Sequence, residues 1–218
     1  MENKKNAFSR RNFIKTSSLL TVGAMGSMNL FALPDTTPLH YSNLQENLNI
    51  VGPKEGFTPH IGTLVSMMNW MRNTMLRPVR GMSVSDLDYL HDDNANTIGA
   101  MLMHLAATER FYQINTLDGK NWGDWSKEDA EKWTTASRLG ENARKKIKGN
   151  NLDFYLDHLS EVREYTLSEF SKRDDEWLLS VDEDFPWGPT NNYCKWFHVC
   201  EHESNHNGQF KFIKSRIS

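Results

Sequence analysis

The chain has 218 residues, of which 25 are basic and 28 acidic, and its formal net charge is −3. The net charge is negative and the sequence shows no basic stripe of the kind through which proteins usually bind nucleic acid. We therefore expect no nucleic-acid partner. Two cysteines are too few for a disulfide framework, and the length fits one globular domain behind an N-terminal leader.

Residues 1–32 predict a bacterial Tat export signal. A charged start leads into Arg10-Arg11, and a short, mildly apolar run follows up to Leu33. Removing residues 1–32 takes away five basic residues and one acidic residue, and the remaining chain has a net charge of −7. We therefore expect an exported, periplasmic protein. Membrane contact is expected only if the signal stays uncleaved and acts as an anchor.

The rest of the chain divides into a linker and one helical domain. Residues 33–56 are polar and contain three prolines, which is typical of a linker. Residues 57–218 predict an all-α fold, a four-helix bundle, with no convincing strand. The periodicity of apolar residues and the start and stop signals place the four long helices at residues 59–76, 95–116, 152–173 and from 190 or 191 to about 216.

Two connections are expected to be irregular. Residues 118–133 are rich in turn-forming residues, and a short basic helix should follow up to Lys148. Residues 182–189 contain two prolines and a glycine and predict a loop.

The last helix carries a ladder of histidines, His198, His202 and His206, with Cys194 one turn before it. A step of four residues drifts only about 40° around a helix, so these side chains share one face. Two imidazoles four residues apart can bind one metal ion. The alternative is that these histidines make ordinary hydrogen bonds in the core or at the surface.

His104 lies within an apolar run of the second long helix, which indicates an interior position. With His202 and His206 it would give three neutral imidazoles and an open position, the layout of a catalytic zinc site. His198 is a rival for the third ligand or a supporting group. A closed coordination sphere that includes His198 or Cys194 would instead indicate a metal-binding protein without turnover, and a bundle without metal is a third interpretation.

Two carboxylates are candidate catalytic proton acceptors, Glu109 and Glu201. Glu109 falls on an apolar seam of its helix, where an unpaired charge would be very costly, so it needs a partner. Asn205 and Gln209 share the face of the histidine ladder and could orient an imidazole.

The segment from His202 to His206 also matches the His-Glu-x-x-His pattern of zinc peptidases, in which the glutamate is the general base. Those enzymes take a further ligand from downstream. Here the residues after His206 include no histidine, glutamate or aspartate. A peptidase is therefore the weaker alternative.

Residues 95–105 (ANTIGAMLMHL) and 198–209 (HVCEHESNHNGQ) resemble the second-helix and last-helix motifs of the DinB/YfiT-like proteins. Residues 86–89 and 185–187 fit the same family. The resemblance implies a four-helix bundle that holds one divalent metal, often zinc or nickel, through three histidines, which by motif position are His104, His202 and His206.

Several members of this family are transferases or isomerases that act with a low-molecular-weight thiol such as bacillithiol or mycothiol. Together with the expected export signal, the resemblance therefore leads us to expect an exported metal-binding protein that performs hydrolysis or thiol transfer on a small-molecule substrate. The substrate itself is not evident from the sequence, and a homodimer is left open.

Overall fold

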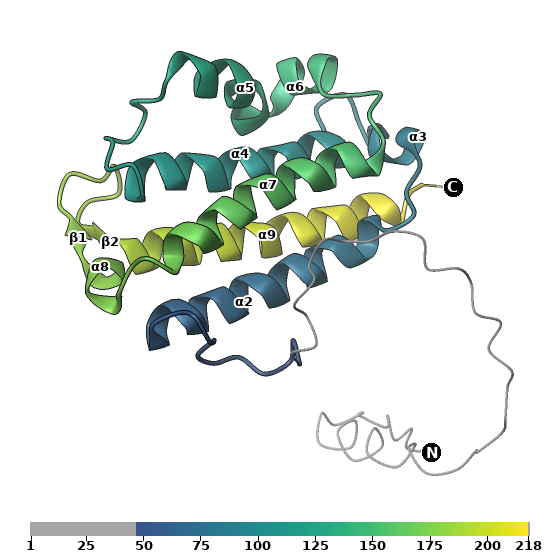
Figure 1. Cartoon of the computed structure of the whole chain (residues 1–218). Coiled ribbons are helices and arrows are strands. Elements are labelled where there is room, and N and C mark those ends of the chain that lie inside the picture. The colour runs from purple at the N-terminus through teal and green to yellow at the C-terminus, as the bar shows by residue number, and fades with distance from the viewer. Residues whose placement is uncertain (1–46, 218) are drawn as a thin grey trace, which may run out of the picture. The chain divides into compact units, whose positions relative to one another are not determined.

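The computed structural model describes residues 47–217, so the expected Tat signal and most of the expected linker lie outside the described residues. Four long helices lie side by side (Figure 1). They are α2 (Pro59–Leu76), α4 (Ile98–Thr116), α7 (Leu152–Phe170) and α9 (Asn192–Lys214). This confirms the predicted all-α bundle. Within residues 47–217, no helix is both long and apolar enough to cross a membrane.

The short elements lie between the long helices. They are the 3-10 turn η1 (Arg77–Val79), α3 (Val84–Leu87), α5 (Lys127–Arg138), α6 (Gly140–Lys146), α8 (Asp175–Leu179), β1 (Val181–Asp182) and β2 (Thr190–Asn191). Helices α5 and α6 lie outside the bundle next to α4, and α8 lies with the strands at one end of the bundle (Figure 1). The antiparallel pairing of β1 with β2 was not expected, because two-residue strands leave no alternating pattern in the sequence.

Each long helix packs against particular neighbours. Helix α4 contacts α5, α7 and α9, and α2 packs against α9. One apolar cluster fills the space around α4, α5 and α7, and a second joins α2 to α8 and the first half of α9. Helix α4 is therefore surrounded by other helices, as its apolar sequence predicts, and a side chain on it can meet side chains of α5 and α9.

The predicted start of α2 at Pro59 is confirmed, but its cap is not local. Thr58 makes no side-chain capping bond to the helix. The first amides are satisfied by Asp175, which starts α8: its Oδ1 accepts from the backbone N–H of His60 at 3.1 Å and of Ile61 at 3.2 Å. The Thr58 hydroxyl donates to the same oxygen. A carboxylate from the far end of the sequence thus supplies the acceptor that an N-cap normally provides.

Other boundaries differ from prediction, among them the end of the third long helix, which lies at Phe170 rather than residue 173. The second long helix begins at Ile98 rather than residue 95, because the Thr97 hydroxyl accepts from the backbone N–H of Ala100 and caps it there. Helix α5 begins at Lys127, inside the stretch predicted to be turn-rich. Its cap is Ser126, whose hydroxyl accepts from the backbone N–H of Asp129.

Candidate metal centre

Helices α4 and α9 bring together the three histidines predicted from the sequence. One ring nitrogen from each of His104, His202 and His206 lies within 4.8 Å of the others. Nε2 of His202 lies 2.7 Å from Nε2 of His104 and 3.3 Å from Nε2 of His206. Residues 98 positions apart in the chain thus meet at one point in the bundle.

The ring of His104 is held in one tautomer by α5. Its Nδ1 lies 3.0 Å from the carbonyl oxygen of Ala136. A carbonyl can only accept, so Nδ1 carries the hydrogen and Nε2 keeps its lone pair. The same arrangement, a ligand histidine whose second nitrogen donates to a carbonyl, recurs in metal sites.

The ring of His206 is oriented from its own helix. Its Nδ1 lies 2.9 Å from Oε1 of Gln209, three residues further along α9. Donation from Nδ1 to this amide oxygen again leaves Nε2 with a lone pair. Gln209 therefore lies against one imidazole of the ladder, as expected from the sequence.

The donor set fits a cation. Burial lowers the pKa of His202 to about 3, with a further contribution from the neighbouring imidazoles, and lowers the pKa of His206 to about 4. Burial also lowers the pKa of His104. All three rings are thus neutral at pH 7. Without a cation, His202 Nε2 has at most one hydrogen to share between two facing lone pairs, whereas a divalent ion satisfies three neutral imidazoles.

His198 and Cys194 do not join the three ligand atoms. His198 turns its Nδ1 to the hydroxyl of Tyr112, 2.9 Å away, although its ring centroid is only 5.2 Å from that of His202. Cys194 is exposed and Cys200 is buried, and both are free cysteines. Among residues 47–217, the only group of three or more His, Cys, Asp or Glu residues arranged to hold a metal is that of His104, His202 and His206.

Glu109 lies in a buried ion network. Its carboxylate accepts from Arg163 Nε at 2.8 Å, from Arg72 Nη2 at 2.9 Å and from Thr166 Oγ1 at 2.7 Å. Burial would raise the pKa of Glu109, but the two guanidinium groups outweigh it and the pKa lies below its ordinary value. The need for a partner is confirmed. Its role as a catalytic proton acceptor stays a prediction, and the contacts observed for its carboxylate are those of the ion network.

Glu203, the glutamate of the peptidase-like pattern, belongs to the same network. Its Oε1 accepts from Arg72 Nε at 2.7 Å and from Arg163 Nη2 at 3.0 Å, and the residue is 1% exposed. A general base of a peptidase must reach a metal-bound water, and this carboxylate is held by two arginines instead. Glu203 therefore does not lie where the general base of a zinc peptidase would have to be.

Neither arginine of this network was predicted from the sequence. The available signal was their position: Arg72 and Arg163 each lie on the apolar stripe of an amphipathic helix and are 3% and 0% exposed. A charge on such a stripe demands an opposite charge across the bundle.

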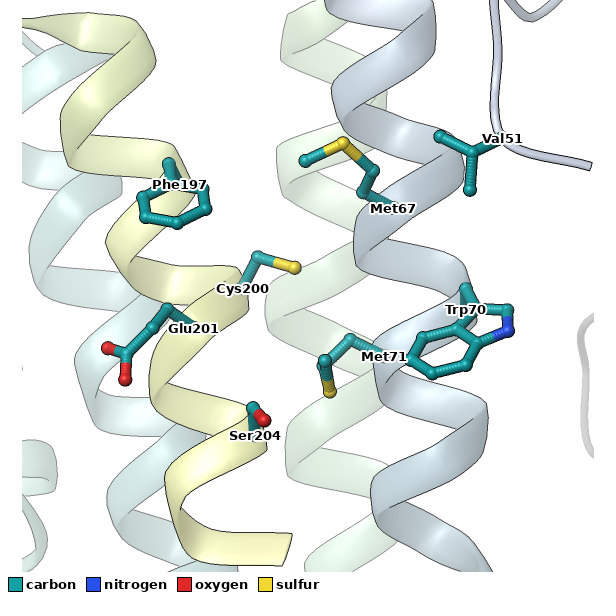
Figure 2. Close-up of a pocket in the computed structure, with 8 residues that line it drawn as sticks. All are labelled: Val51, Met67, Trp70, Met71, Phe197, Cys200, Glu201 and Ser204. Atoms are coloured by element: carbon teal, nitrogen blue, oxygen red, sulfur yellow. The ribbon is translucent and has the colours of Figure 1, made fainter. Parts of the chain in front are cut away.

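Glu201 lies at another surface of α9. It lines an apolar groove of about 300 Å³ between α2 and α9, together with Cys200, Phe197 and Ser204 from α9. Figure 2 shows the thiol of Cys200 pointing toward Met67 and Met71 of α2, whereas the carboxylate of Glu201 points away from α2. Burial raises the pKa of the Cys200 thiol to about 11, so this cysteine stays protonated at pH 7. The role of Glu201 in proton transfer stays a prediction.

The fold and the site together define an all-α bundle protein with a three-histidine site suited to a divalent cation. The chain belongs to the mycothiol S-transferase family: the family model described as Mycothiol-S-transferase matches residues 63–218, well over half of the chain. This is a DinB/YfiT-like family, so the resemblance drawn from the sequence is confirmed. None of the curated proteins matches the chain.

Proposed function

We propose that this protein is a metal-dependent transferase that joins a low-molecular-weight thiol to a second small molecule. The observation that carries the proposal is the convergence of three Nε2 atoms on one point in a chain of the mycothiol S-transferase family. In the transfer, a bond forms between the thiol sulfur and an electrophilic carbon. The leaving group departs with its electron pair, and the thiol proton passes to a base.

His104, His202 and His206 would hold the ion. Three neutral imidazoles suit zinc or nickel, and we expect one of these two. When bound, the cation would lower the pKa of a thiol or water ligand toward neutrality.

The protein's own contribution is to prepare the ligands. The Ala136 carbonyl and the Gln209 amide fix two rings with their Nε2 lone pairs inward, and burial keeps the imidazoles unprotonated. A preset tautomer removes the need to reorganise the rings when the ion binds. His198 and Cys194 stay out of the ligand set, which supports an open position for a substrate rather than a closed, purely structural sphere.

The first test is elemental analysis of the purified full chain. We expect about one divalent ion per chain, lost in His104→Ala and in His206→Ala. The control is His60→Ala, because His60 is exposed and lies outside the cluster. The site would be refuted if the parent protein carries no stoichiometric metal, or if the double variant His104→Ala with His206→Ala keeps its metal.

The second test separates catalysis from simple metal storage. The metal-loaded chain is incubated with mycothiol or bacillithiol and an electrophile such as chlorodinitrobenzene, and the thioether is measured. Turnover that disappears with the metal supports the transferase. Full metal occupancy with no thioether from any thiol would favour the non-catalytic metal-binding protein.

Export is proposed from the sequence alone. Arg10-Arg11 opens the segment that resembles a Tat signal, and that segment lies outside the described residues. Arg10→Lys with Arg11→Lys should retain the protein in the cytoplasm, as cell fractionation would show. Equal periplasmic amounts of parent and variant would argue against this route.

A further inference from the structure

Five aromatic rings form a closed circuit beside the histidine site. These rings form the aromatic cluster, which consists of Tyr112, Trp122, Phe185, Trp187 and His198. Each ring contacts the next, with centroid separations of 5.0 Å from Tyr112 to Trp122, 5.4 Å to Phe185, 5.2 Å to Trp187, 5.0 Å to His198 and 5.7 Å back to Tyr112. The rings meet at tilted or edge-to-face angles, the arrangement that aromatic pairs prefer.

The cluster has a buried base and an exposed rim. Tyr112 and Phe185 are 1% and 4% exposed, whereas Trp122 and Trp187 are 37% and 58% exposed. Tryptophan is highly buried on average, so the exposure of Trp187 is unusual for a side chain that serves only the core. Two indole rings fixed by buried neighbours therefore present rigid apolar surface to solvent.

The cluster is continuous with the metal centre. His198 belongs to the cluster, and its ring centroid lies 5.2 Å from that of His202, one turn further along α9. A small molecule that rests on the indole rings is thus within reach of a group bound at the three histidines. The α2–α9 groove of Figure 2 contains none of the cluster residues.

A buried lysine holds the segment that carries Phe185 and Trp187. Lys195 of α9 is 2% exposed and donates from Nζ to Asp182 at 2.7 Å and to Asn115 at 2.9 Å. The same Nζ lies 4.5 Å from the centre of the Phe185 ring. A buried charge satisfied in this way fixes the position of β1 and of the loop after it, so the indole of Trp187 is held in place rather than free to move.

We propose that the exposed rings of the aromatic cluster, Trp122 and Trp187, bind the planar aromatic part of the second substrate, the electrophile. This inference rests on the proposed thiol transfer, because that reaction needs a second substrate beside the metal. Flat apolar groups stack on or meet the edges of indole rings with a gain beyond simple burial of area. The protein thus prefers aromatic over aliphatic electrophiles.

The test measures binding rather than turnover. Zinc-loaded full chain is titrated by calorimetry with 1,3-dinitrobenzene, a neutral planar probe that has no leaving group. Replacing either exposed indole by alanine should raise the Kd about tenfold, and Trp187→Phe should keep the Kd within about threefold of the parent. Cyclohexanol, which is apolar but not planar, should bind at least about tenfold more weakly than the probe.

Trp70→Ala is the matched control. Trp70 is 37% exposed, as is Trp122, but it lines the α2–α9 groove. The Kd of this variant should equal that of the parent, and thermal unfolding and zinc content should be unchanged in Trp122→Ala and Trp187→Ala.

An unchanged Kd in both Trp122→Ala and Trp187→Ala would overturn the proposal, as would an equal increase in Trp70→Ala. The two proposals fail in different ways. Absence of thioether formation in the parent refutes the transferase, whereas the dinitrobenzene titration tests the aromatic cluster without any turnover.

Discussion

Glu203 faces Arg72 across the bundle, with its Oε1 2.7 Å from Nε of the guanidinium, although its neighbour in sequence is His202, one of the three candidate metal ligands. Adjacent residues on a helix point about 100° apart. Helix α9 therefore presents imidazoles on one side and a buried carboxylate on another. The carboxylate completes a network of two glutamates and two arginines at the centre of the bundle.

Breaking this network should be costly. Arg163→Met leaves the carboxylates of Glu109 and Glu203 with one guanidinium between them, and we expect a loss of about 3–5 kcal/mol in the free energy of unfolding. Urea denaturation measures it. The control is Lys132→Met, which removes an exposed pair with Glu161 and should cost no more than about 1 kcal/mol. Equal losses in the free energy of unfolding for Arg163→Met and Lys132→Met would show that burial does not determine how much an ion pair contributes to stability.

The network also predicts acid sensitivity. Arg163 and Arg72 hold the pKa of Glu109 below the ordinary value of 4.5. A lowered pKa in the folded state stabilises the protein above the unfolded value, and that stability is lost as the pH falls through the folded value. Glu109→Gln should therefore destabilise most at pH 7. The difference from the parent should shrink as the pH falls below about 4.5, because the unfolded chain then takes up a proton at Glu109, whereas the folded chain takes it up only at a lower pH.

Unfolding curves of parent and Glu109→Gln at pH 7, 5, 4 and 3 check this. A difference that stays constant over this range would mean that the charge of Glu109 contributes nothing.

Gln209 should tune the metal site without being a ligand. Gln209→Ala removes the acceptor 2.9 Å from His206 Nδ1, so the ring loses its fixed orientation and tautomer. We expect metal affinity to fall about 10- to 100-fold, measured by competition with a chelator. Asn205→Ala is the control, because Asn205 is exposed on the same helix. Unchanged affinity in Gln209→Ala would show that packing alone orients the imidazole.

Two helical glycines should respond to alanine with opposite signs. A Cβ at Gly99 of α4 would lie 2.6 Å from the hydroxyl oxygen and 2.7 Å from Cζ of Tyr155, a fully buried residue. Gly99→Ala should therefore destabilise the protein by about 1–3 kcal/mol. Gly208 of α9 is exposed, and a Cβ added there would have nothing within 4 Å, so Gly208→Ala should stabilise the protein by up to about 1 kcal/mol.

Thermal unfolding of Gly99→Ala and Gly208→Ala measures the two changes in stability. Tyr155→Leu in the Gly99→Ala background should recover part of the loss. Destabilisation by both alanines alike would point to a common cause other than contact with Tyr155.

The features of the site that depend on the local periodicity of a helix could be predicted from the sequence. The spacing of His202 and His206 placed two imidazoles on one face of a helix, and the apolar surroundings of His104 placed it inside. The sequence did not reveal Arg72 and Arg163 as the partners of Glu109, because these contacts join residues 37 and 54 positions apart. A carboxylate on an apolar seam can be catalytic or structural, and only its neighbours in space separate the two.

The cap of α2 has a consequence for how the chain is made. The acceptor for the amides of His60 and Ile61 is Asp175, more than 110 residues downstream. A ribosome adds about 5–20 residues per second, so the start of α2 waits roughly 6–23 seconds for its acceptor to be synthesised. During that interval the first amides of α2 in a nascent chain lack the side-chain acceptor that they have in the folded protein.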